Sequence, residues 1–138
     1  MKQRKWLWWV LTIIAVSTLI SGVVQLAAPG FVLRVVSAES TPVTRHFFGI
    51  VGMFMALFGG LLAQALLAAA PAPVVLLWAG LQKIGASMAV VLGVIRGIFG
   101  AAALAIAAFD LVSGVLLFFY RAAQLKEDQS SWKAQGVR

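Results

Sequence analysis

Four long hydrophobic runs, separated by short polar segments, organise the sequence. They cover about residues 6–28, 47–70, 74–94 and 98–120. Each run is long enough for an α-helix that crosses a membrane, which needs ~20 mainly apolar residues. The pattern therefore predicts an all-α integral membrane protein, with a four-helix bundle in residues 1–121 and a polar cytoplasmic tail in residues 122–138.

The segments between the runs contain residues that end helices. Pro71 and Pro73 predict a tight turn after the second run, because proline lacks a backbone donor and its ring clashes with the preceding helical turn. Arg96 marks the turn between the third and fourth runs, since it would otherwise be a lone charge inside an apolar helix. Residues 29–46 form the long connection, where the apolar stretch around Arg34 predicts either an interfacial turn or an irregular loop.

The composition agrees with a single membrane domain. Of the 138 residues, 62% are hydrophobic and 11% are charged, whereas soluble domains carry about 25% charged residues. The chain has no cysteine, which excludes disulfides and thiolate chemistry. The first run exceeds the ~7–15-residue apolar region of a signal peptide, so we expect a retained helix.

The distribution of charge predicts the orientation in the membrane. The formal net charge of +7 comes from Lys and Arg residues gathered at both ends, with three in residues 2–5 and four from residue 121 onward. This is the positive-inside pattern, so both termini are predicted to face the cytoplasm. The expected partner of this charge is the lipid bilayer, and we expect no nucleic acid.

Two charged side chains interrupt the third and fourth runs. Lys83 lies 13 positions before Arg96, and Asp110 lies 14 positions after it. At ~1.5 Å per residue, two antiparallel helices bring them to nearly the same depth. A charge at the bilayer centre costs about 2.5–3.5 kcal/mol on insertion scales, so opposite charges at one depth predict a buried ion pair. A clamp that fixes the helix register and a site that handles a ligand or a proton both remain open.

Further polar side chains accompany this predicted ion pair. Gln82 and Ser87 lie near the lysine, and Ser113 follows the aspartate by three positions. These three side chains are candidates for a hydrogen-bonded network or for a ligand site, because buried polar groups are tolerated when their members are satisfied. In the first run, the positions Ser17, Ser21 and Gln25 share one face. They either line a small polar cavity or bond their own helix, as hydroxyls in membrane helices usually do.

Small residues form a stripe along the second run. Its members are Gly49, Gly52, Ala56, Gly59 or Gly60, and Ala63. In lipid, such stripes allow helix backbones to approach closely. The stripe predicts packing within the bundle, and a homo-oligomer or a partner helix on the same face is the alternative.

Arg45 and His46 precede the second run and form a polar spot at the predicted outer surface. One histidine cannot provide the several ligands of a metal site. The chain also lacks a His-Glu-x-x-His motif and a pair of carboxylates within the runs. We therefore expect no metal, no cofactor and no catalytic residues, and we expect that the protein is not an enzyme.

The polar positions of the last three runs resemble those of small bacterial four-helix membrane proteins, the DoxX-like group and neighbouring families of unknown function. The resemblance lies in Arg45-His46-Phe47-Phe48-Gly49, in the cation Lys83 and in Phe109-Asp110-Leu111. It implies a four-helix fold and a bacterial inner membrane. The resemblance leads us to expect Arg and Glu where this chain has Lys83 and Asp110, so it does not imply a bidentate clamp.

Two functional hypotheses follow from these patterns. The first is a non-enzymatic accessory or assembly protein of a larger membrane complex, because the chain is short, lacks catalytic groupings and offers small-residue faces. The second is a small membrane carrier or binding module for a proton, an ion or a small apolar ligand, centred on Lys83 and Asp110. In the tail, Trp132 is either a membrane-surface anchor or a partner contact.

Overall fold

The computed structural model describes residues 2–70 and 72–136, and within these ranges every regular element is a helix. The elements are α1 (Lys2–Ala27), α2 (Pro29–Val35), α3 (Pro42–Leu67), α4 (Pro73–Ile95) and α5 (Ala103–Gln135). This confirms the all-α prediction. Four of the helices, α1, α3, α4 and α5, are long and apolar enough to cross a membrane.

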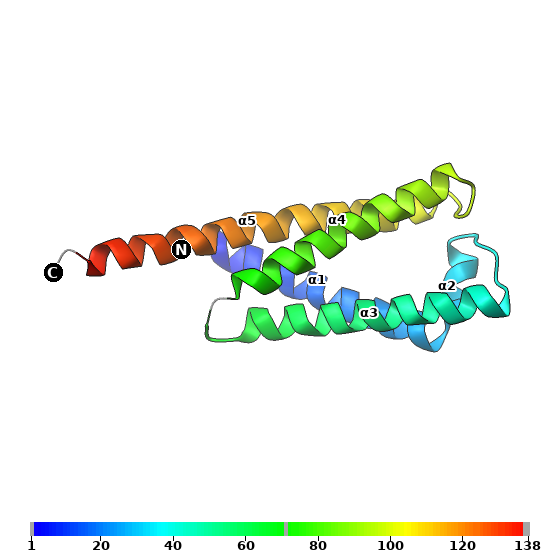
Figure 1. Ribbon diagram of the computed structural model, residues 1–138, viewed down its shortest axis with the longest axis horizontal. Helices are drawn as coiled ribbons and strands as arrows, with labels where there is room; N and C mark the ends of the chain where they lie inside the picture. Colours follow the sequence, from blue (N-terminus) through cyan, green and yellow to red (C-terminus); the bar gives the residue numbers. More distant parts are fainter. Residues whose placement is uncertain (1, 71, 137–138) are drawn as a thin grey trace.

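The four long helices are arranged as two pairs. α1 packs mainly against α3, and α4 packs mainly against α5, with far fewer contacts between the pairs (Figure 1). The pairs lie close together where α1 begins and α5 ends, and they separate toward the end that carries α2 (Figure 1). The bundle is therefore not packed evenly along its length.

The hydrophobic core lies at the end where the pairs meet. Leu11 of α1, Leu62 of α3, Leu76 of α4 and Leu117 of α5 are all buried there and belong to one cluster. Because this cluster draws on all four long helices, it holds the two pairs together at that end.

Glycine residues allow α1 and α3 to approach at the distance of backbone contact. A Cβ atom added at Gly52 would lie 2.6 Å from the backbone nitrogen of Leu26, and one added at Gly59 would lie 2.5 Å from that of Leu19. Gly22 of α1 meets α3 equally closely. The small-residue stripe of the second run is thus used within the chain, against α1.

The second long helix begins at Pro42, five residues before the predicted boundary. The Thr41 side chain accepts a hydrogen bond from the Thr44 backbone, and the Thr44 side chain accepts one from the Thr41 backbone. This capping box satisfies free donors at the helix start, and proline is well suited to the first helical position. Arg45 and His46 therefore belong to the first turns of α3.

The connection between the first two long helices contains the short helix α2. It starts with Pro29 at a favoured N-terminal position, and Leu33 anchors it to the interior. Beyond it, the backbone carbonyl of Val36 accepts a hydrogen bond of 2.8 Å from the Gly100 N–H in the turn before α5. This bond joins the two halves of the chain at the end opposite the core.

The last helix begins later and ends later than the sequence predicts. α5 starts at Ala103 rather than at about residue 98, because a turn with Gly97 at a φ of +70° follows α4. It continues to Gln135, so most of the predicted polar tail is helical. Residues 122–135 are rich in Ala, Gln, Leu, Lys and Glu, which are strong helix formers.

Candidate functional site

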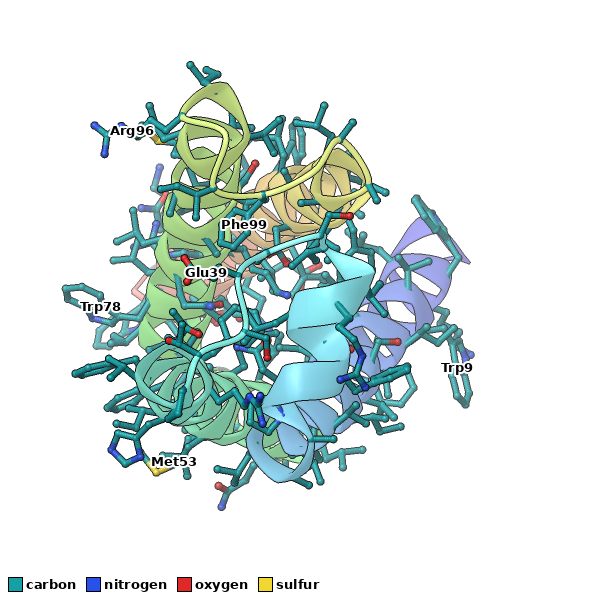
Figure 2. The ribbon with its side chains drawn as sticks, turned by 90° about the vertical axis from the view of Figure 1, so that its right-hand side faces the viewer. Trp9, Glu39, Met53, Trp78, Arg96 and Phe99 are labelled. Atoms are coloured by element: carbon teal, nitrogen blue, oxygen red, sulfur yellow. The ribbon has the colours of Figure 1, made fainter. Side chains whose placement is uncertain are left out.

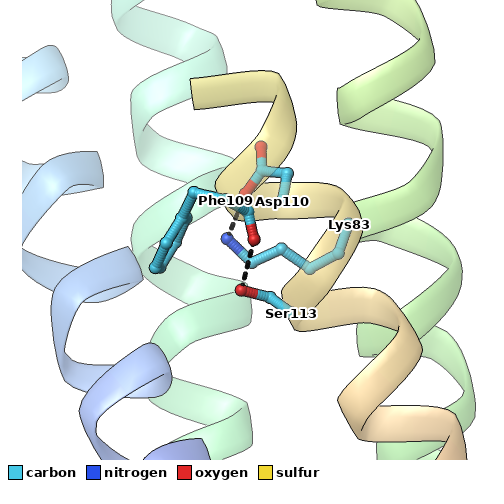
Figure 3. A network of polar contacts seen from close by, with 4 residues as sticks. All are labelled: Lys83, Phe109, Asp110 and Ser113. Atoms are coloured by element: carbon cyan, nitrogen blue, oxygen red, sulfur yellow. Dashed lines mark hydrogen bonds and ion pairs between the residues drawn. The ribbon is translucent and has the colours of Figure 1, made fainter. Parts of the chain in front are cut away.

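The structure brings the two charges of the third and fourth runs into contact. Lys83 projects from α4 and Asp110 from α5, and the lysine Nζ lies 2.6 Å from the aspartate Oδ1 (Figure 3). Their side chains are only 3% and 7% exposed. The Nζ atom also lies 5.1 Å from the centre of the Phe109 ring, a distance at which the ring face attracts a cation.

This arrangement leaves hydrogen-bonding capacity on the lysine. An ammonium group has three N–H donors. In the described part of the chain, Asp110 is the acceptor that contacts the Lys83 ammonium. The described contacts therefore leave two of the three N–H donors of Lys83 without a protein acceptor.

The three polar residues predicted near the ion pair lie in different surroundings. The Ser113 hydroxyl donates to the Phe109 carbonyl of its own helix at 2.6 Å (Figure 3). Ser87 is buried one turn from the lysine, and among the described contacts it makes no hydrogen bond to either charge. Gln82 lines a hollow between α3 and α4. The ion pair is thus a compact two-residue unit rather than part of a larger hydrogen-bonded network.

The predicted outer polar spot lies apart from the ion pair. Arg45 donates from its Nε to the Ser40 hydroxyl at 3.0 Å and from an Nη to the Ser40 carbonyl at 3.1 Å. His46 is exposed and contacts the Phe47 ring edge to face. These residues border a separate hollow beside α2, so the structure does not join them to Lys83.

The ion pair lies in the wall of a cavity between the two helix pairs. One part, of about 450 Å³, is lined mainly by α1 and α5 and includes both charges. The other part, of about 300 Å³, is lined mainly by α3, α4 and α5. The residues that line both parts are Gln25, Val32, Met55, Ile106 and Asp110. The two parts adjoin at these residues and are together named the central cavity; each has a volume within the ~300–1,000 Å³ of typical small-molecule sites.

Two polar side chains of α1, Thr18 and Gln25, belong to the lining of this cavity. The Gln25 side chain is buried and donates from its Nε2 to the Phe48 carbonyl of α3 at 2.9 Å. Thr18, which is 3% exposed, has a buried hydroxyl without a hydrogen-bond partner among the described residues. Of the polar face predicted on α1, Ser21 and Gln25 line the cavity, whereas Ser17 does not.

Sequence reasoning missed Thr18. It lies seven positions before Gln25, two helical turns away, and therefore shares a face with it. The seven-residue spacing could have indicated Thr18 as part of the polar face. The predicted face instead followed the four-residue spacing of Ser17, Ser21 and Gln25, which leaves Thr18 out.

Apolar side chains make up most of the remaining wall. Met55, Ile106 and Phe109 border the cavity near the charges, and Phe99 borders it near the turn before α5. Viewed from the end that carries α2, Phe99 points inward, whereas Trp78 points away from the bundle (Figure 2). The cavity thus combines one neutralised ion pair and a few amide and hydroxyl groups with a largely hydrocarbon lining.

Comparison with known proteins identified no relative of this chain. No family model, curated protein or solved structure matches the chain. The resemblance to the DoxX-like group stays a prediction.

Proposed function

We propose that the protein is a membrane-embedded binding module that holds a small, mostly apolar molecule in the central cavity. The observation that carries this proposal is the position of the Lys83–Asp110 pair in the wall of a ligand-sized, otherwise apolar space. A pair that served only as a clamp would need no adjacent cavity, because close packing around it would fix the helices better. A cavity with a few placed polar groups is the usual form of a small-molecule site.

The outer surface supports the membrane location. Apolar side chains on all four long helices are more than half exposed, among them Ile13, Leu57, Met88 and Val112. Soluble monomers rarely expose apolar surface on this scale. The start of α1 and the end of α5 lie at the same end of the molecule, so their basic residues would meet the same, cytoplasmic, side of a bilayer (Figure 1).

A cavity-filling substitution tests the proposal. Ala86 lines the central cavity on α4, and Ala108 is an exposed residue on α5 that does not line it. We expect Ala86→Phe to reduce labelling of Met55 by a diazirine-bearing hydrocarbon probe in lipid nanodiscs, and Ala108→Phe to leave it unchanged. Peptide mapping by mass spectrometry locates the label. Labelling confined to lipid-facing side chains, and equal in both variants, would contradict a binding cavity.

A second candidate is the accessory or assembly role, which the length of α5 favours. This helix extends past the other long helices (Figure 1), and its Trp132 is 78% exposed. Exposed tryptophan is common at protein contacts. If this role holds, a stoichiometric partner co-purifies in mild detergent and is lost in Trp132→Ala but kept in Trp78→Ala. A chain that purifies alone in both cases would argue against it.

A further inference from the structure

The unpaired hydroxyl of Thr18 distinguishes one wall of the central cavity. Its oxygen is buried and has no hydrogen-bond partner within the described residues. Thr12, six positions earlier on α1, behaves differently, because its hydroxyl donates to the Trp8 carbonyl at 2.9 Å. Such a bond to the preceding turn is the usual arrangement for hydroxyls in helices. A buried hydroxyl without this bond carries a desolvation penalty, which a bound polar group would remove.

The charges of the cavity restrict what can bind there. Lys83 and Asp110 neutralise each other at 2.6 Å, so the site as a whole carries no net charge. A ligand with its own net charge would place an unpaired charge in apolar surroundings, which is strongly unfavourable. An uncharged oxygen suits the site better, because the Lys83 ammonium and the Thr18 hydroxyl are both donors.

We propose that the molecule bound in the central cavity is uncharged, with a hydrocarbon body and a hydroxyl or carbonyl group, and that Thr18 selects it by hydrogen bonding to that group. This inference rests on the binding function proposed above. A hydroxyl group matches the chemistry of all three polar residues, because it can accept from an ammonium and from a hydroxyl and can donate to a carboxylate. The hydrocarbon body would lie against apolar residues of the wall such as Met55 and Ile106.

Competition between matched probes tests the class of ligand. The full-length protein in lipid nanodiscs is labelled with a diazirine-bearing analogue of dodecanol, in competition with unlabelled dodecanol, dodecane, dodecanoic acid or dodecylamine. We expect dodecanol to compete at lower concentration than the other three. Equal or better competition by the acid or the amine would overturn the inference of an uncharged ligand.

Substitutions at Thr18 test its role as a specificity-determining residue. Thr18→Val keeps the shape and removes the hydroxyl, and Thr18→Ser keeps the hydroxyl. We expect Thr18→Val to raise the dodecanol concentration for half-maximal competition by roughly two- to tenfold, the effect of one hydrogen bond. Thr18→Ser should retain the value of the natural protein, Thr12→Val serves as the control, and competition by dodecane should not change in any variant.

The outcomes separate the inference from the function on which it rests. If the diazirine-bearing dodecanol analogue labels the cavity but Thr18→Val leaves competition by dodecanol unchanged, Thr18 does not select the ligand and the inference is wrong. If no probe labels Met55 in the natural protein, the binding function itself fails and the inference fails with it. A higher dodecanol concentration for half-maximal competition in Thr18→Val, restored to the natural value in Thr18→Ser, supports both the binding function and the role of Thr18.

Discussion

Replacing Lys83 by Met or Asp110 by Leu removes one member of the ion pair and leaves the other buried without a counter-charge. Both side chains are more than nine-tenths buried, and each is the other's ionic partner at 2.6 Å. The double variant removes both charges at once. Comparing the three variants therefore separates the contribution of the intact pair to the free energy of unfolding from the penalty of leaving one charge buried without its partner.

The expected magnitudes follow from the distance and the burial. At 2.6 Å and an effective dielectric constant of about 20, the two charges attract each other by about 6 kcal/mol. Removing two ions from water costs several kcal/mol each, so attraction and desolvation nearly cancel and the pair itself contributes little. Removing one partner of a buried pair typically costs about 3–5 kcal/mol. Because the central cavity leaves room for water beside the remaining charge, we expect about 3 kcal/mol for each single variant.

The assay is unfolding in detergent micelles by titration with dodecyl sulfate, followed by far-ultraviolet circular dichroism. We expect the double variant to recover at least half of the free energy of unfolding that the two single variants lose together. Arg96→Met is the control, since this exposed residue at the end of α4 should change the stability by less than about 0.5 kcal/mol. A penalty from the unpaired buried charge is excluded if each single variant lowers the free energy of unfolding by less than about 1 kcal/mol, or if the two losses add in the double variant.

The same double variant separates a clamp from a ligand site. If the pair only fixes the helix register, the recovered protein should still be labelled by the dodecanol probe as before. If the pair binds the ligand, the double variant should fold and yet need more dodecanol for half-maximal competition. A folded double variant with unchanged competition would leave the ion pair without a part in binding.

Three further changes test the packing and the helix ends in the same unfolding assay. Gly52→Ala should lower the free energy of unfolding by about 1–3 kcal/mol, because the new Cβ would lie 2.6 Å from the backbone of α1. Gly60→Ala has no atom within 4 Å of its Cβ, so it should leave the free energy of unfolding unchanged or raise it by up to about 1 kcal/mol. Equal effects would exclude close packing of α1 and α3. Trp8→Phe should lose about 0.5–1.5 kcal/mol with its 2.8 Å indole bond to the end of α3, whereas Trp9→Phe, at a side chain 60% exposed, should change little. Thr41→Ala removes the capping box and should lower the free energy of unfolding by about 0.5–2 kcal/mol. It should also speed amide hydrogen exchange in the first turn of α3, and unchanged exchange would contradict the capping assignment.

The parts of the fold that depend on local pattern could be predicted from the sequence. Long apolar runs predicted the four long helices, because their length and composition are sufficient signals. Counting residues from Arg96 placed Lys83 and Asp110 at one depth, because the rise of a helix is fixed. The start of α3 at Pro42 could also have been predicted, since Thr41 and Thr44 flank this proline at the spacing of a capping box.

The central cavity could not be predicted, because it depends on which helices pair and how closely. Gly22 on α1 did not stand out in the sequence, yet with Gly52 it lets α1 and α3 make backbone contact. The space between the pairs follows from that unequal packing rather than from any motif. The same limit applies in part to Thr18, whose spacing from Gln25 indicates a shared helix face but whose place in the cavity wall depends on the three-dimensional arrangement.

The uneven packing accounts for how a cavity of this size persists in so short a chain. Glycine contacts make the α1–α3 pair a stiff unit, and the core around Leu11 and Leu117 fixes the two pairs to each other at one end. At the other end the backbone bond between Gly100 and Val36 spans the gap. The spacing of the two pairs is therefore set at both ends of the space between them. A change that loosens the α1–α3 pair, such as Gly52→Ala, should therefore weaken dodecanol binding as well as stability, although Gly52 does not line the cavity.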